Sequence, residues 1–356
     1  MSSYWEVIAS KRANSILDKI PLEWRLSQDD LAYAKSQKNL KTSISRFLNN
    51  PCLLNIMIPE ALEKAERLDR LHQNNMPKGV LHGLPISLKD QFHVKGSDTT
   101  MGYVGWIGTF EGDGESEKVG RVDSEIVAQL ESMGAVVFCK YDETTNNIIG
   151  QTLNPVSMGL SCGGSSGGEA ALIAVGGSSL GLGTDIAGSV RVPAAFCGIY
   201  GIKPSSGRFS YRDVANTVRF NQILIFPVLE APLTMKYWQN PGQTLIPSVV
   251  GFLSSSIIGL EIIMSALFPL SPTYRSSQEP FSWKGSQCVI SSKPVSSLVQ
   301  GDRLKFGIMW CDGMIEPHPP VRRGLQMVVD ALRNVGHEVE FFPKSAKLFG
   351  LIYHSR

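Results

Sequence analysis

The sequence predicts an α/β protein in which a mixed central β-sheet is surrounded by helices. The chain of 356 residues is 43% hydrophobic and 19% charged, which is enough for one large core or two smaller ones. The apolar residues 84–89 are expected to form a buried strand, residues 124–133 a helix and residues 135–139 a second strand. Strands and helices that alternate in this way are typical of mixed α/β layers.

The first eighty residues are expected to be mostly helical and to pack around the sheet. Residues 1–21 place apolar side chains among charges, which suits an amphipathic helix better than the uninterrupted apolar stretch of a signal peptide. Residues 61–73 repeat apolar positions at helical spacing. Beyond residue 208 the pattern weakens, until a strand expected at residues 303–309 and a helix expected at residues 320–335.

Composition and charge argue against several classes of function. The net charge is +2, with 34 basic against 32 acidic residues, so no electric field attracts nucleic acid. The six cysteines form no C-x-x-C pair and no histidine cluster joins them, so no metal site is expected. The GxxxxGK[ST] and Rossmann glycine patterns are also missing from the sequence. Scattered single cysteines are typical of a reducing compartment, and we expect a cytoplasmic protein.

A run rich in glycine and serine at residues 161–210 contains two serines, Ser165 and Ser189, in glycine-rich turns. It alternates with apolar blocks that belong in a core, which argues against a flexible linker. A serine hydroxyl becomes a strong nucleophile only when a neighbouring base takes its proton. Lys89 ends an expected buried strand, and burial favours the neutral amine that can act as a base. We therefore predict Ser189 as nucleophile, Ser165 as proton relay and Lys89 as base.

The residues around Ser189 are expected to support this chemistry. The segment TDIAGS, from Thr184 to Ser189, offers successive backbone amides that can converge on one oxyanion. A helix expected at residues 168–175 directs the partial positive charge of its N-terminus toward the serines. Asp185 and Arg191 are expected to form a structural ion pair that braces the loop, so that removing either one damages activity through geometry.

Two other interpretations of these residues stay open. Lys89 is followed by Asp90, and a lone buried lysine is more often a member of a structural ion pair than a base. Residues 163–167 spell G-x-S-x-G, the nucleophile elbow of α/β hydrolases, which would make Ser165 the nucleophile. An elbow must directly follow a buried strand, but proline and glycine interrupt the residues before this one. The histidines offer no obvious partner with a companion acid: His72, His82, His93, His318, His337 and His354.

Three segments resemble the amidase signature family of serine hydrolases. They are SLKDQFHVKG at residues 87–96, the glycine and serine run at 161–210, and GIKPSSGR at 201–208. Further segments resemble the fungal acetamidase branch in particular, at residues 98–112, 146–155 and 306–325. The resemblance covers roughly residues 30 to 340 and implies the amidase signature fold.

The resemblance also implies a set of site residues. In this family a lysine base, a bridging serine in an unusual cis peptide and a serine nucleophile form the triad, and they fall on Lys89, Ser165 and Ser189. The oxyanion amides fall on Ile186, Ala187, Gly188 and Ser189, and no cofactor is needed. The family usually has glycine where Ala187 stands. If that position needs a positive φ, alanine strains the loop by about 1 kcal/mol.

Three stretches of the chain depart from the family pattern. After Lys140 the chain runs through YDET directly into TNN, so several residues are expected to be missing and one wall of the acyl pocket open. Residues 218–239 form an apolar insertion without a counterpart. The family's domain continues beyond the GHEVEFFP segment at 336–343, so we expect an incomplete C-terminal part with an aggregation-prone sheet edge.

We therefore expect one amidase signature domain with four parts. These are a helical region at residues 1–80, a catalytic core at 81–210, the insertion at 218–239 and a partial C-terminal region at 240–356. In the last part, residues 249–270 are long and apolar enough for a membrane span, but they contain four serines and Glu261. The resemblance implies a core helix there and no membrane span.

The resemblance implies an amidase that hydrolyses small aliphatic or aryl-acetic amides to an acid and ammonia through an acyl-enzyme. The partner is then a small-molecule amide, and a homodimer is compatible with the sequence. One alternative is an inactive, truncated or incorrectly assembled gene product, and another is an α/β-hydrolase-like esterase that uses Ser165. A transamidosome-type subunit shares the motif, but the acetamidase-like segments argue against it.

We predict that residues 218–239 are encoded by a short intron read through in frame. Joining Thr217 to Asn240 restores DVANTNPGQTLIPS, and an exposed loop would avoid so apolar a composition. Valine codons begin with GT and a glutamine codon can end with AG, as the ends of an intron require. Sequencing the transcript across this interval is expected to show a spliced message. An unspliced reading frame in all mature messages would contradict the hypothesis and leave a genuine surface insertion.

Overall fold

The computed structural model describes residues 3–21, 29, 52–141, 143–215, 247–270, 303–311 and 315–341. These residues belong to two compact units, Met1–Ser282 and Trp283–Arg356. The insertion proposed at residues 218–239 lies outside the described residues.

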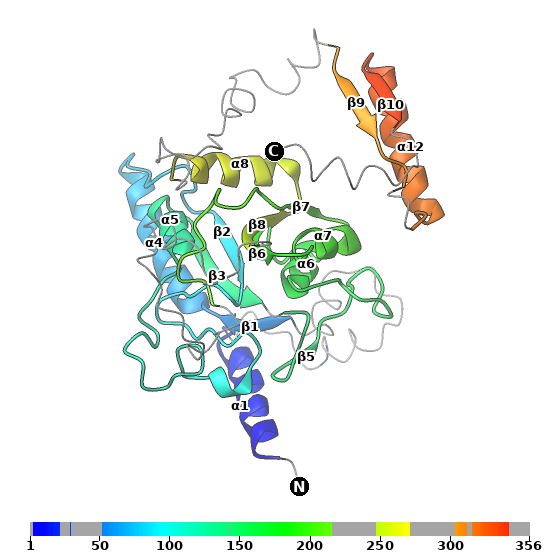
Figure 1. Cartoon of the computed structure of the whole chain (residues 1–356). Helices are drawn as coiled ribbons and strands as arrows, with labels where there is room; N and C mark the ends of the chain where they lie inside the picture. Colours follow the sequence, from blue (N-terminus) through cyan, green and yellow to red (C-terminus); the bar gives the residue numbers. More distant parts are fainter. Residues whose placement is uncertain are drawn as a thin grey trace, which may run out of the picture. The chain divides into compact units, whose positions relative to one another are not determined.

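The first unit is built on a six-stranded mixed sheet with the strand order β1-β3-β2-β6-β8-β7 (Figure 1). The central strands β3, β2 and β6 are parallel, whereas β1, β8 and β7 run antiparallel to the neighbours they pair with. The strands of this sheet are β1 (Leu53–Ile56), β2 (Pro85–Lys89), β3 (Val136–Tyr141), β6 (Leu180–Asp185), β7 (Tyr200–Ile202) and β8 (Val249–Ser254). A separate hairpin pairs β4 (Thr145–Asn146) with β5 (Gly150–Gln151). The mixed sheet expected from the sequence is confirmed.

Helices cover both faces of this sheet. Phe252 and Leu253 are consecutive in β8 and therefore point to opposite faces. Phe252 packs in a large cluster with α5 and α8, whereas Leu253 packs in a second cluster with α6 and α7. The helices of the unit are α1 (Tyr4–Asp18), α4 (Ile58–Gln73), α5 (Glu125–Ser132), α6 (Gly167–Ala174), α7 (Arg191–Cys197) and α8 (Ile257–Leu267), with short 3-10 turns η2 (Val104–Trp106) and η4 (Phe268–Leu270).

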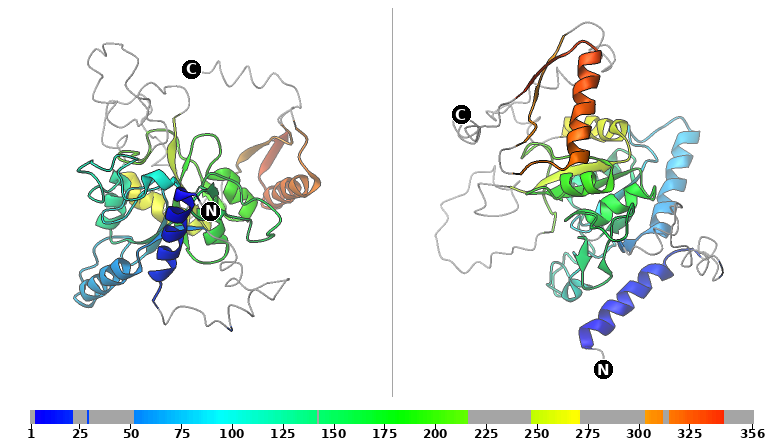
Figure 2. Two further views of the ribbon diagram at one scale, coloured as in Figure 1. Left: turned by 90° about the horizontal axis from the view of Figure 1, so that it is seen from below. Right: turned by 90° about the vertical axis from the view of Figure 1, so that its right-hand side faces the viewer.

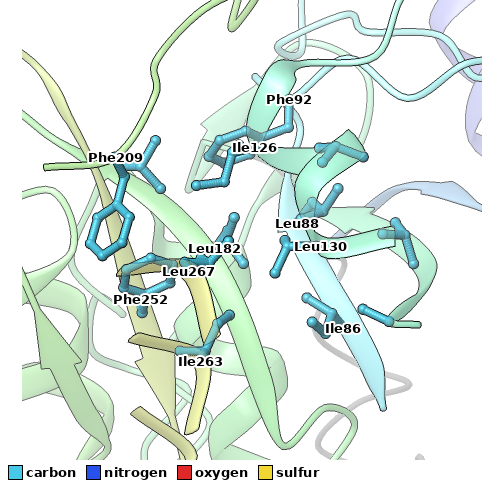
Figure 3. Packing of buried hydrophobic residues seen from close by; sticks show 14 of the residues in the cluster. Ile86, Leu88, Phe92, Ile126, Leu130, Leu182, Phe209, Phe252, Ile263 and Leu267 are labelled. Atoms are coloured by element: carbon cyan, nitrogen blue, oxygen red, sulfur yellow. The ribbon is translucent and has the colours of Figure 1, made fainter. Parts of the chain in front are cut away.

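The large cluster is the main hydrophobic core of the unit (Figure 3). Ile86 and Leu88 from β2 and Leu182 from β6 are each fully buried, and they face the α5 and α8 side of the sheet. Burying each of these side chains contributes about 2 kcal/mol. The alternate residues of β2 and β6 that face this core thus anchor both strands in the sheet.

The described part of the first eighty residues is mostly helical, as expected, and the short strand β1 between α1 and α4 pairs with β3. The expectation for the later apolar stretch was wrong in part. Residues 249–270 form no continuous core helix: the first six form the fully buried strand β8, and α8 starts after a break at Ser255 and Ser256. The hydroxyl of Ser256 caps α8 by accepting from the amide of Gly259 at 3.0 Å. None of the helices among the described residues meets the length and apolarity that a membrane crossing requires.

The helix α1 lies beside β1 at one edge of the sheet (Figure 2). Lys19 donates to the Asn55 side chain at 2.8 Å, and Arg12 forms an ion pair with Asp98 at 3.5 Å. These contacts attach the amphipathic helix predicted at the N-terminus to the core of the first unit.

The second unit contains a strand, a helix and a strand in the order β9 (Lys305–Ile308), α12 (Pro319–Asn334) and β10 (Glu338–Phe341). The strands β9 and β10 pair in parallel, so the connection through α12 forms a βαβ unit. The strand and helix expected at residues 303–309 and 320–335 are confirmed with small changes in their bounds.

One buried carboxyl in the core has no charged partner. Glu169 on α6 is fully buried, accepts a hydrogen bond from the hydroxyl of Ser87, and its Oε2 contacts no donor among the described residues. Burial raises the pKa of Glu169 from 4.5 to about 8, although the Ser87 hydrogen bond lowers it. At neutral pH this carboxyl is therefore mostly protonated.

We predict that Glu169 makes the protein less stable as pH rises from about 5 to 8. The folded state holds a proton on Glu169 that the unfolded state has released in this range, so the free energy of unfolding falls by roughly 1 kcal/mol per pH unit. Glu169→Gln keeps the shape of the side chain but has no group that titrates, so it is expected to remove this dependence of stability on pH. Urea unfolding at several pH values measures it, with Glu60→Gln on exposed α4 as the control. Equal slopes in wild type and Glu169→Gln would contradict the prediction.

Candidate active site

Lys89 is the last residue of β2 and is only 1% exposed. Its Nζ lies 2.6 Å from the Oγ of Ser165 and donates to the Oγ1 of Thr184 at 3.1 Å. Thr184 stands on the adjacent parallel strand β6, so the sheet itself brings these two side chains together. The structure thus brings Lys89 and Ser165 into direct contact, as the sequence predicts. Thr184 is a contact that the sequence reasoning missed.

Lys89 also forms an ion pair with Glu143, whose Oε1 lies 3.0 Å from Nζ. Lys89 is therefore a member of an ion pair, with Glu143 as a partner, and whether it is also a base stays a prediction. The carboxylate of Asp90 instead contacts Lys140 at 2.9 Å, and both of these side chains are buried. Glu143 lies in the YDET stretch where the chain departs from the family pattern, and this departure is the only sequence signal that pointed to it.

Ser165 lies directly before α6, and the Gly164–Ser165 peptide bond is cis, as the resemblance implies. The preceding loop is held by Thr144, whose hydroxyl donates to the carbonyl of Gly163 at 2.7 Å. In the described residues from 152 to 166, no strand leads into Ser165; the segment consists of turns and bends with one isolated bridge between Leu153 and Ser161. This local structure does not match a nucleophile elbow, which requires a strand directly before the serine.

Two histidines of the first unit have contacts away from the two serines. The ring of His82 contacts the amide of Lys78 and the carbonyl of Leu68, and His93 contacts Glu111 at 3.2 Å. His318 and His337 belong to the second unit, and His354 lies outside the described residues. A serine and histidine pair at Ser165 therefore receives no support from the described part of the chain.

Ser189 lies in the loop between β6 and α7, next to the loop of Ser165. The amide of Ser166 donates to the carbonyl of Ser189 at 3.0 Å, which joins the two serine loops through their backbones. The transfer of a proton from Ser165 to Ser189 stays a prediction. The loop turns at Gly188, whose φ of +128° is unfavourable for other residues, whereas Ala187 does not have a positive φ. The strain considered for Ala187 is therefore absent.

The proposed oxyanion donors differ from the expectation at one position. The amide of Gly188 donates to the Oδ1 of Asp185 at 2.7 Å, so it does not point to a free oxyanion. The amides of Ile186, Ala187 and Ser189 remain as the proposed donors. The buried carboxylate of Asp185 thus accepts a hydrogen bond from one amide of the loop, and this bond helps to fix the positions of the other amides.

Asp185 and Arg191 form the predicted structural pair. Arg191 donates to both carboxylate oxygens of Asp185, at 2.9 and 3.0 Å, and the amide of Val190 adds a bond at 3.1 Å. Burial by itself would raise the pKa of Asp185, but these bonds and the Gly188 amide outweigh it and lower the pKa to about 2. Asp185 is therefore ionised throughout the neutral range.

Two paired glycines in the sheet allow the Ser189 loop to approach the strands closely. Gly183 in β6 pairs with Gly251 in β8, and neither has a side chain. A Cβ at Gly183 would lie 3.0 Å from Val190 Cγ2, and one at Gly251 would lie 2.9 Å from the same atom. Val190 is fully buried and follows Ser189 directly, so the loop approaches the sheet closely because these two glycines leave room for it.

Comparison with known proteins now identifies the family. The family model described as Amidase matches residues 43–353, and the chain therefore belongs to the amidase family. Over 309 residues it is 37% identical to the acetamidase of Emericella nidulans, covering 84% of this chain and 50% of that relative. Over 289 residues it is 38% identical to the acetamidase of Aspergillus oryzae, covering 78% of this chain and 47% of that relative.

The solved structure of a fatty acid amide hydrolase has the same fold. The two chains superpose with a TM-score of 0.67 at 25% identity, covering 96% of this chain and 63% of the other. This chain spans about half the length of the two acetamidases that it matches. The fold class predicted from the sequence is confirmed.

We predict that Asp185→Asn lowers the reactivity of Ser189 by roughly tenfold or more, because the loop amides and Ser189 lose a shared anchor. The measurement is the rate of labelling by a fluorophosphonate, at neutral pH and with folding checked by circular dichroism. Asp69→Asn, on the exposed face of α4, is the control and is expected to react at the wild-type rate. An unchanged rate in Asp185→Asn would show that the ion pair does not brace the site.

Proposed function

We propose that this chain hydrolyses small carboxylic amides, aliphatic or aryl-acetic, to an acid and ammonia. The observation that carries the proposal is the 2.6 Å contact between the buried Nζ of Lys89 and the Oγ of Ser165. This contact supports Lys89 as the base and Ser165 as the proton relay, because a proton passes between two groups that lie within hydrogen-bond distance. The similarity to two acetamidases supports amides as the substrate class.

The proposed reaction begins with proton transfer along the three side chains. Neutral Lys89 takes a proton from Ser165, which takes one from Ser189, and Ser189 Oγ attacks the carbonyl carbon of the amide. The charge that develops on the carbonyl oxygen is stabilised by the amides of Ile186, Ala187 and Ser189. No cofactor takes part in these steps.

The second half of the reaction returns the protons. The amine leaves as the tetrahedral intermediate collapses, and it receives a proton through Ser165 from Lys89. Water then attacks the acyl-enzyme ester on Ser189, with the relay acting again as the base. The products are the carboxylic acid and ammonia, and the site returns to its starting state.

The short loop after Lys140 bears on the range of substrates. Residues 143 and 144 lie at the site, since Glu143 contacts Lys89 and Thr144 contacts the loop before Ser165. We propose that this side of the acyl pocket is less enclosed than in the family pattern, so that longer acyl groups are also accepted. A cytoplasmic location and a homodimer stay predictions.

We predict that Ser189→Ala abolishes ammonia release and that Lys89→Ala does so unless the pH is raised. The test measures ammonia release from acetamide and longer amides, together with mass-spectrometric location of a fluorophosphonate label. Ser132→Ala, an exposed serine on α5, is the matched control and is expected to keep full activity.

The location of the label separates the proposed mechanism from its alternatives. Label on Ser189 together with turnover supports the triad, whereas label on Ser165 that persists in Ser189→Ala would establish the elbow mechanism. Folded protein that gives neither turnover nor label would show that the motif is present without the activity.

A further inference from the structure

The contact between Glu143 and Lys89 is the feature that the proposed mechanism does not use. A general base must hold a lone pair, yet here a carboxylate lies 3.0 Å from the amine that should act as that base. The Glu143 side chain is 25% exposed, whereas that of Lys89 is 1% exposed. A charge on the buried amine is therefore compensated mainly by this carboxylate rather than by water.

The hydrogen-bond directions around Nζ are fixed by its neighbours. The hydroxyl of Thr184 donates to the side-chain oxygen of Gln91, so it must accept from Lys89. A carboxylate has only acceptors, so Glu143 also receives an N–H from Lys89. Two N–H groups of Lys89 are thus directed to Thr184 and Glu143, and Nζ also lies within hydrogen-bond distance of Ser165.

The other titratable groups near Lys89 have partners of their own. Asp90 is paired with Lys140 and Asp185 with Arg191, while Glu169 is mostly protonated at neutral pH. Two buried tyrosines also lie near Lys89 among the described residues: Tyr211 close to Thr184, and Tyr141 beside Lys89 in the sheet. Burial raises the pKa of Tyr211 to about 12 and also raises the pKa of Tyr141. Among the described carboxylates around Lys89, Glu143 is the one that contacts Nζ.

We propose that Glu143 is the counterion of Lys89 and sets the pH at which this amine loses its proton. The carboxylate orients Nζ toward Ser165 and at the same time favours its ammonium form, so the neutral amine forms at a higher pH than it would without this carboxylate. Glu143 is thus a positioning residue that acts through Lys89 and does not touch the substrate. The consequence for catalysis rests on the proposed function, whereas the protonation of Lys89 can be measured without it.

The experiment compares wild type with Glu143→Gln. The amide oxygen of glutamine can still accept from Nζ, so this change removes the charge and keeps the hydrogen bond. The Lys89 signal is followed from pH 6 to 11 by NMR of protein labelled with ¹³C at the lysine Cε, and Lys89→Met assigns it. The rate of fluorophosphonate labelling at Ser189 is measured over the same range. Glu117→Gln, on an exposed loop, controls for the loss of one negative charge.

We expect the titration midpoint of Lys89 to fall by about one pH unit or more in Glu143→Gln, since an opposite charge at this distance has an effect of that size. The labelling rate at pH 7 is expected to rise about tenfold, with no change in Glu117→Gln. Glu143→Ala must lower the midpoint as well, because it also removes the charge, and it serves as a second variant if the glutamine protein folds poorly.

The two readouts separate this proposal from the proposed function. A Lys89 midpoint that is the same in wild type and both Glu143 variants would overturn the counterion role. A lowered midpoint without any label on Ser189 would support the counterion role and contradict the triad.

Discussion

The carboxyl end of β2 carries two successive buried charges, and the rest of the site depends on how each of them is compensated. Lys89 and Asp90 are both about 1% exposed, and an unpaired charge in such a position costs several kcal/mol. Asp90 is satisfied by Lys140 and by the amides of Thr100 and Met101 at 2.9 and 2.7 Å. Because Asp90 has these partners, Lys89 remains available to the serine side of the sheet.

The same arrangement recurs one strand away at Asp185. There too a buried carboxylate binds a basic side chain and several backbone amides of the loop that follows the strand. Both carboxylates act on backbone that is otherwise irregular, and ionised acceptors form stronger hydrogen bonds than neutral ones. Two adjacent parallel strands thus end in loops whose shapes are fixed by charge, and the proposed lysine and serine groups lie between these loops.

The sequence was sufficient for the elements whose signal is local. The apolar run of β2, the helix α6 after the glycine turn, and the pairing of Asp185 with Arg191 all depend on residues that are close in the chain. Residues 249–270 misled the prediction because a buried strand and an apolar helix have the same composition, and only the serines at the break separate them. Glu143 was missed because its contact with Lys89 joins residues far apart in sequence. Hydropathy and spacing carry no information about such a contact.

Because Gly183 and Gly251 together leave room for Val190, the position of the Ser189 loop above the sheet depends on the register between β6 and β8. Side chains alternate along a strand, so a slip of one residue in β8 would place Val250 or Phe252 opposite Gly183 and invert the faces of the whole strand. The new side chain would then occupy the space of Val190, and the loop that carries Ser189 would have to move away from the sheet. The position of the proposed nucleophile therefore depends not only on the glycine-rich motif around it but also on Gly251 in β8, some sixty residues further along the chain.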